Sequence, residues 1–180
     1  MTDDSRFAIH DVVFRYARGV DRRDWESVRS CYHPDATDDH GNYSGGRDGL
    51  IDWMKERHES ILMSLHYISN VLVDFLRDDA ARVESYCTTV QRTAARDAAV
   101  SLRMYAIAGL DDARESDVVE TSVRCRFIDF VTKRDGEWRV AKRTVVFESL
   151  DYRVFTPPIF GPTFVVGSRS TDDALWVVGE

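Results

Sequence analysis

The chain has 180 residues, 43% of them hydrophobic and 31% charged, which is typical of a single folded domain and argues against extended disorder. The formal net charge is −7 and the arginines are scattered, so we expect no binding to nucleic acid. The N-terminus lacks a signal-peptide pattern and no segment is apolar enough to cross a bilayer, so we expect a cytoplasmic protein without membrane contact.

Three helices are predicted in the first part of the chain. The first begins near Ser5 and ends at the polar run 21–24, and its apolar positions have the spacing of one buried face: Ile9, Val12, Val13, Tyr16, Ala17 and Val20. Asp24 can cap a second helix over residues 25–32, because a short side-chain oxygen accepts hydrogen bonds from first-turn amides. The apolar periodicity of residues 47–64 predicts a third helix.

Strand-forming residues dominate the chain after the third helix. Aromatic and β-branched residues gather in runs at 66–76, 82–93, 100–110 and 118–133. Asp135 and Gly136 can adopt the positive φ angles of a tight hairpin, so residues 123–133 should pair antiparallel with residues 138–147. Residues 33–46, between the helices, are predicted to form a short strand or a loop.

The order of these elements predicts an α+β fold. A curved, mostly antiparallel sheet must cover its apolar face, and the three preceding helices are the available cover. We therefore expect a cone-shaped barrel, with the sheet wrapped around the helices to leave a conical cavity. This domain should span residues 1–150. Residues 151–180 contain prolines that cannot donate ladder hydrogen bonds, so this tail should pack on the domain or rim the cleft.

A histidine at the start of an apolar strand needs an explanation. His66 could be a packed core residue with satisfied ring nitrogens, or a base in a cavity. Taken alone, Asp21 is readable as a helix-end residue and Tyr16 as a core residue. Arg143 could be an exposed cross-strand ion-pair partner. Sequence position by itself does not decide between these interpretations.

Three stretches carry a resemblance to a known family: YARGVD at 16–21, LHYISN at 65–70 and RDGEWRVAKR at 134–143. In this order they resemble the SnoaL-like branch of the nuclear-transport-factor-2-like (NTF2-like) superfamily over residues 5–150. Within that branch the chain is most similar to scytalone dehydratase, bile acid 7α-dehydratase and hexachlorocyclohexane dehydrochlorinase.

The resemblance implies an Asp–His pair in an apolar cone, in which the histidine abstracts a proton and the aspartate orients it. Asp21 and His66 match this pair. Arg143 matches an arginine after the last hairpin of the dehydrochlorinase. Tyr16 matches a tyrosine of the bile acid dehydratase, where the dehydrochlorinase has a lysine. A tyrosine favours polarising a carbonyl or assisting a hydroxyl leaving group over departure of chloride.

The residue types fit this chemistry. A neutral imidazole can accept a proton near neutral pH when a carboxylate fixes its other nitrogen as a donor. Removing a proton next to a carbonyl builds negative charge on oxygen, which Tyr16 or Arg143 could stabilise in a water-poor cavity. No metal or organic cofactor is required. The predicted substrate-binding residues are Trp53, Asn70, Phe127, Asp129 and Phe147.

Two functional classes remain open. The first is a cofactor-independent lyase or isomerase that acts on a small apolar cyclic metabolite, such as a polyketide, a steroid or an aromatic-derived molecule. The second is a non-catalytic ligand-binding or assembly subunit, similar to the small subunit of aromatic-ring-hydroxylating dioxygenases. A gap of more than one water between His66 and Asp21 would favour the second class. The resemblance also implies a homodimer or homotrimer.

Some polar residues lie outside this set. His40 and Asn42 are expected near the mouth of the cavity. Cys31, Cys87 and Cys125 have no metal-ligand spacing and lie among apolar residues, so we expect buried, reduced thiols.

Overall fold

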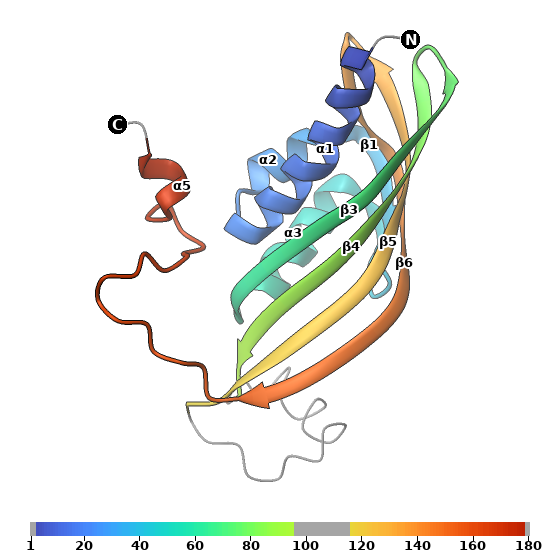
Figure 1. Ribbon diagram of the computed structural model, residues 1–180. Coiled ribbons are helices and arrows are strands. Elements are labelled where there is room, and N and C mark those ends of the chain that lie inside the picture. The colour runs from blue at the N-terminus through green and yellow to red at the C-terminus, as the bar shows by residue number, and fades with distance from the viewer. Residues whose placement is uncertain (1–2, 96–115, 179–180) are drawn as a thin grey trace.

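The helices lie on the concave side of a long, curved sheet in the computed structural model (Figure 1), which describes residues 3–95 and 116–178. The helical layer consists of α1 (Asp3–Arg22), α2 (Trp25–Ser30) and α3 (Arg47–His58). The strands are β1 (Tyr32–Asp39), β2 (Ser44–Gly46), β3 (Ile61–Arg77), β4 (Ala80–Ala94), β5 (Val118–Arg134) and β6 (Glu137–Phe155). A short helix, α5 (Ala174–Val177), lies near the C-terminus. The predicted α+β fold is confirmed.

The six strands follow the order β2-β1-β6-β5-β4-β3. Neighbouring strands pair antiparallel, apart from β1 and β6, which pair in parallel. The sheet is not closed, so β3 forms one edge and the β1–β2 hairpin forms the other. An edge strand leaves alternate backbone N–H groups without a ladder partner. On β3, one such group is the backbone amide of His66, which donates to the side chain of Asp21.

The buried face of α1 agrees with the predicted periodicity, since Ile9, Val13 and Tyr16 are at most 1% exposed. The helix ends in a Schellman motif, in which the Arg23 amide donates to the Val20 carbonyl and the Asp24 amide donates to the Gly19 carbonyl (3.3 and 2.8 Å). Arg23 takes the left-handed conformation that this motif needs, with φ of 57°. Asp21 therefore lies in the last turn of α1, beside the start of β3.

The third helix is shorter than predicted, because it ends at His58 and the next residues form β3. Ile61 pairs with Thr93 of β4, and its side chain is buried while that of Leu62 is exposed. Burial that alternates along the chain is the pattern of a strand with one face on the core. The predicted strand at 100–110 lies outside the described residues.

Several local predictions are confirmed. Asp135 and Gly136 form the β5–β6 hairpin with φ angles of 52° and 86°, which matches a type I′ turn. The Asp24 side chain caps α2 by accepting from the Ser27 amide at 3.1 Å. The three cysteines are free and buried: Cys31, Cys87 and Cys125.

The chain after β6 returns to the helical layer, and α5 lies near the C-terminal end of α1 (Figure 1). Arg169 of this segment donates to the backbone carbonyls of Val20 and Asp21 at 2.9 and 2.8 Å. The tail is thereby attached to the part of the helix that carries the candidate aspartate. Within residues 3–95 and 116–178, no helix is long and apolar enough to cross a membrane.

Candidate active site

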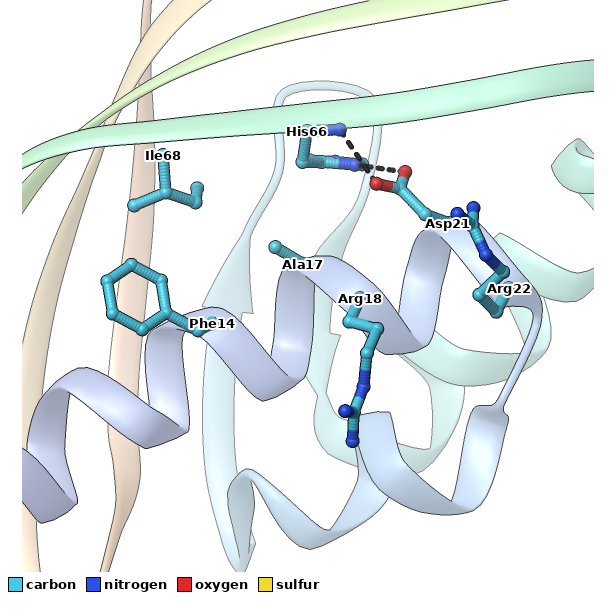
Figure 2. Close-up of a pocket in the computed structure, with 7 residues that line it drawn as sticks. All are labelled: Phe14, Ala17, Arg18, Asp21, Arg22, His66 and Ile68. Atoms are coloured by element: carbon cyan, nitrogen blue, oxygen red, sulfur yellow. Dashed lines mark hydrogen bonds and ion pairs between the residues drawn. The ribbon is translucent and has the colours of Figure 1, made fainter. Parts of the chain in front are cut away.

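Asp21 and His66 form a direct pair between the end of α1 and the edge strand β3 (Figure 2). The Nδ1 atom of His66 lies 2.6 Å from Oδ1 of Asp21. A carboxylate accepts hydrogen bonds, so Nδ1 carries the proton and Nε2 is left with its lone pair in the neutral ring. The backbone amide of His66 also donates to Oδ2 of Asp21, at 2.8 Å. One carboxylate therefore fixes both the strand and the imidazole.

A third donor completes the environment of Asp21. Ser64 lies two residues before His66 and on the same face of β3, and its hydroxyl donates to Oδ1 of Asp21 at 2.8 Å. The Gln91 side-chain amide donates in turn to the Ser64 hydroxyl at 3.4 Å. Charge-assisted hydrogen bonds of this kind hold a buried carboxylate in one orientation. Asp21 is 7% exposed, and its partners compensate for its loss of water.

The pKa of His66 is raised from its ordinary value of 6.5. Burial of the ring lowers the pKa, but the hydrogen bond and the negative charge of Asp21 together outweigh burial. The thiol of Cys87 adds a smaller contribution in the same direction. A histidine in this setting accepts a proton more readily than a free imidazole does.

A cavity of about 880 Å³ lies inside the cone, and His66 is part of its wall. Most of the wall is apolar, with Val20, Met54, Val123 and Val145 among its members. The threonines of β4 and β5 add hydroxyl groups: Thr89, Thr93 and Thr121. Phe147 and Leu150 of β6 also line the cavity and are about half exposed, so the cavity opens to solvent along this strand.

A second, smaller hollow lies on the outer side of the pair, between α1 and β3 (Figure 2). Its volume is about 240 Å³, and Phe14, Ala17 and Ile68 contribute to its wall. Asp21 and His66 line it as well. The imidazole therefore lies in the partition between this hollow and the main cavity.

Tyr16 lines the main cavity, as the sequence led us to expect. Its hydroxyl lies 3.9 Å from the sulfur of Met54, which is a weak acceptor, and it also interacts with the Arg143 guanidinium, which can only donate to it. Burial raises the pKa of the phenol well above its ordinary value, so the hydroxyl stays protonated. Tyr16 can therefore donate a hydrogen bond to a ligand oxygen without a strong competitor in the described structure.

Arg143 and Asp129 are buried beside the cavity and are not among the residues that line it. The guanidinium donates to both carboxylate oxygens of Asp129, at 2.7 and 2.6 Å. It also lies over the rings of Tyr16 and Phe127, 4.3 and 4.4 Å from their centroids. Asp129, which was predicted to bind substrate, does not line the cavity, and Arg143 occupies its carboxylate. Arg143 supports the ring of Tyr16 and does not reach the cavity.

The other predicted binding residues divide clearly. Trp53, Phe127 and Phe147 line the cavity, and His40 and Asn42 do so too. Asn70, which was also predicted to bind substrate, does not line the cavity. It is exposed on β3 with φ of 49°, within a shift of the β3–β4 register between Ser69 and Leu72. A bulge of this kind turns the side chain away from the ladder.

His58 and Arg169 were missed as site residues. His58 lines the cavity, and its Nδ1 lies 2.7 Å from Nη2 of Arg169. A guanidinium can only donate, so Nδ1 accepts and the ring proton lies on Nε2. Burial, together with the charges of Arg169 and Arg57, lowers the pKa of His58 to about 2. The ring is therefore neutral at every physiological pH.

The signals for the missed residues differ in strength. Ser64 could have been found, because residues two apart on a strand share a face and Ser64 precedes His66 by two. His58 occupied an apolar position of the predicted third helix, which indicated burial. Arg169 had no local signal, since it acts on a turn 148 residues earlier in the chain. Within the described residues, no group of three His, Cys, Asp or Glu side chains could hold a metal ion.

Comparisons with solved structures identify the same fold in several proteins. A provisionally assigned scytalone dehydratase from Novosphingobium aromaticivorans is 18% identical, with a TM-score of 0.62 over 87% of this chain and 89% of that one. A provisionally assigned aromatic ring hydroxylase from the same organism is 19% identical, with a TM-score of 0.67 over 85% and 96%. A type 2 hexachlorocyclohexane dehydrochlorinase is 17% identical, with a TM-score of 0.67 over 89% and 96%.

These identities are low, so the structural similarity establishes the fold alone. No curated protein sequence matches the chain. The family model for the SnoaL-like domain matches residues 3–144, which include α1, the β1–β2 hairpin, β3 and the first part of β6. The chain therefore belongs to the SnoaL-like domain family, within the NTF2-like superfamily.

Proposed function

We propose that this protein is a cofactor-independent lyase of the dehydratase type, or an isomerase that uses the same first step, and that it acts on a small apolar cyclic molecule. The observation that carries the proposal is the Asp21–His66 pair, with 2.6 Å between carboxylate oxygen and ring nitrogen at the wall of a large cavity. An imidazole oriented by a carboxylate at the wall of a largely apolar cavity is suited to proton abstraction.

The pair supplies the base. Nε2 of His66 takes a proton from the carbon next to a carbonyl, and Asp21 stabilises the imidazolium that forms. Because the pKa of His66 is raised, the base is in its active form at pH values above that pKa. Activity should therefore fall as the pH is lowered through the pKa of His66.

Tyr16 supplies the complementary group. Loss of the proton leaves negative charge on the carbonyl oxygen, and a donor placed at that oxygen lowers the barrier in a site with little water. The Tyr16 hydroxyl lines the cavity and stays protonated because burial raises its pKa. Arg143 holds the ring of Tyr16 from behind, at 4.3 Å from its centroid.

The cavity points to the class of substrate. A volume of about 880 Å³ accepts a molecule of two or more fused rings. The walls offer aromatic and aliphatic contact from Trp53, Phe127 and Phe147, together with hydroxyl, amide and imidazole groups and the guanidinium of Arg57. This composition favours a largely apolar ring system that carries a few polar substituents.

A second candidate function is a non-catalytic subunit of a ring-hydroxylating enzyme. The fold similarity to the protein named as an aromatic ring hydroxylase is the observation that favours it. That function would not require an imidazole hydrogen-bonded to a buried carboxylate at a cavity wall. The direct Asp21–His66 contact, with no room for a water between the two, therefore favours catalysis.

The test uses a bicyclic β-hydroxy ketone, 4-hydroxy-4-(2-naphthyl)butan-2-one, whose loss of water gives a conjugated ketone that absorbs light. Replacing the base by His66→Gln, or its partner by Asp21→Asn, should lower kcat/KM by about 10²- to 10⁴-fold, the usual range for general acid–base catalysis. His10→Gln, on α1 and outside the cavity wall, is the matched control and should leave the rate unchanged. Full activity of both His66→Gln and Asp21→Asn would contradict the proposal.

A further inference from the structure

A second carboxylate–histidine pair lies at the end of β1. Nδ1 of His40 is 3.1 Å from Oδ1 of Asp38, and the Asp38 side chain is completely buried. The His40 side chain is 20% exposed and lines the same cavity as His66. Because Nδ1 donates to the carboxylate, Nε2 is the nitrogen left to meet a ligand. The pairing has the same form as Asp21–His66, at the opposite edge of the sheet.

A row of charged residues across three strands holds Asp38 in place. Asp38 of β1 is in register with Arg143 of β6, and Arg143 is in register with Asp129 of β5. The Tyr32 hydroxyl donates to Oδ2 of Asp38 at 2.8 Å and accepts from Arg143 at 3.1 Å. Two carboxylates thus face one guanidinium, so the row holds one more acidic than basic side chain where it meets the ring of His40.

The turn after β1 fixes the position of His40. Its backbone amide donates to the Tyr43 carbonyl at 2.7 Å, which closes the turn. Gly41 has φ of 74°, and a Cβ atom there would lie 2.9 Å from the Phe147 ring, so this position requires glycine. The His40 ring packs at 5.7 Å from the ring of Trp53. The imidazole is therefore held by its backbone, its carboxylate and an aromatic neighbour.

We propose that His40 is the general acid that protonates the departing oxygen, and that Asp38 orients it. This role rests on the proposed elimination and concerns its second event, the departure of the hydroxyl group. A hydroxyl group leaves poorly unless it gains a proton as its carbon–oxygen bond breaks. His66 and His40 line one cavity from opposite edges of the sheet, and the proposal places a substrate between them with the carbon–hydrogen bond at His66 and the carbon–oxygen bond at His40.

The step balances in atoms and charge. Nε2 of His66 takes the proton from carbon, and the electron pair of that carbon–hydrogen bond becomes the new carbon–carbon double bond. The carbon–oxygen bond breaks, its electron pair stays on oxygen, and the oxygen takes the proton from Nε2 of His40, so that water leaves. Solvent then removes the proton from His66 and returns one to His40, whose side chain is partly exposed.

The test compares two leaving groups on one skeleton. Acetate departs without a proton, so 4-acetoxy-4-(2-naphthyl)butan-2-one needs the base but not the acid, whereas the 4-hydroxy compound needs both. His40→Gln should lower kcat/KM for the hydroxy ketone by about 10²-fold or more, and by less than about threefold for the acetoxy ketone. His66→Gln should lower both. Equal effects of His40→Gln on the two compounds, or no effect on either, would overturn the proposal.

A binding measurement separates this role from the elimination itself. If the parent protein converts neither ketone, the proposed elimination is contradicted, and His40 can still be examined through 2-naphthol and 2-methylnaphthalene. The parent should bind 2-naphthol about tenfold more tightly, measured by quenching of tryptophan fluorescence, because Nε2 of His40 meets its oxygen. His40→Gln should reduce this preference, and His10→Gln should retain it. An unchanged preference in His40→Gln would overturn the contact.

Discussion

Two buried histidines near the end of α1 have opposite electrostatic environments. His66 meets the carboxylate of Asp21, and its pKa is raised. His58 meets the guanidinium of Arg169, and its pKa is lowered to about 2. Both side chains line the main cavity. Burial lowers the pKa of each ring, so the nature of the partner accounts for the difference.

The comparison shows how one residue type can serve two roles in one cavity. The carboxylate of Asp21 favours the protonated form of His66, so this ring can take up a proton, as a base must do in each turnover. His58 cannot, so it offers a fixed Nε2–H donor and a rigid piece of wall. Arg169 joins the two environments, because it bonds both to His58 and to the backbone carbonyl of Asp21. The C-terminal segment thus stabilises the last turn of α1, which carries Asp21.

Replacing Arg169 should have the largest effect on the environment of His58 and on the stability of the protein. Arg169 donates to three carbonyl oxygens and one ring nitrogen, and a buried hydrogen bond to a charged group contributes about 1.5–3 kcal/mol. Arg169→Ala should therefore lower the free energy of unfolding by about 3 kcal/mol, measured with urea, and should raise the pKa of His58 towards 6.5, measured by NMR. The exposed Arg124→Ala should cost less than about 1 kcal/mol. An unchanged pKa of His58 in Arg169→Ala would show that the charge of Arg169 does not contribute to lowering it.

The second prediction concerns stability at acidic pH. Between pH 6.5 and about 2, the unfolded chain binds a proton at His58 and the folded chain does not. The contribution of His58 to the free energy of unfolding should therefore fall by about 1.4 kcal/mol for each pH unit below 6.5. Comparing the parent with His58→Gln in urea at a series of pH values isolates this slope. Parallel curves for the two proteins would contradict the lowered pKa.

His66 should behave in the opposite sense. Its folded-state pKa lies above 6.5, so its contribution to stability is fully present below pH 6.5 and is lost as the pH rises through the folded pKa. The difference in stability between the parent and His66→Gln should therefore shrink as the pH rises from 6.5 through the folded-state pKa of His66. A difference that grows over this range would mean that burial, and not Asp21, dominates the ring.

The smallest expected effect separates two buried serines. Ser64→Ala removes one hydrogen bond to Asp21 and should cost about 1 kcal/mol and roughly fivefold in kcat/KM. Ser85 is equally buried on β4, but its hydroxyl has no partner among the described residues. Ser85→Ala should therefore be neutral or slightly stabilising. Equal losses in both variants, by urea unfolding and turnover, would show that the Ser64 contact does not orient Asp21.

The sequence predicted much of the fold because its signals were local. The periodicity of α1, the Asp24 cap and the Asp135-Gly136 hairpin each depend on neighbouring residues, and all three are confirmed. The end of the third helix was misplaced, because the residues after His58 are apolar at spacings that fit a helix as well as a strand. Tertiary pairing of Ile61 with Thr93 decided between the two.

The site was less accessible to prediction. Tyr16, Asp21 and His66 were predicted because their motifs resemble those of a known family; Tyr16 and His66 line the main cavity, and Asp21 is hydrogen-bonded to His66. Arg143 was predicted to lie at the cavity because it matches an arginine of the dehydrochlorinase. In the structure Asp129 of β5 is its cross-strand neighbour, and the two side chains form an ion pair. A cross-strand partner of this kind depends on register, which sequence position alone does not define.

The most direct test of the central claim is the exchange of protons for deuterium at the carbon next to the carbonyl of 2-tetralone, in heavy water. This exchange requires a base and an enolate but no leaving group, so it measures the proposed action of Asp21 and His66 alone. The parent and His10→Gln should catalyse exchange, and His66→Gln and Asp21→Asn should reduce it to the background rate, as followed by NMR. Exchange at the parent rate in both His66→Gln and Asp21→Asn would contradict the account.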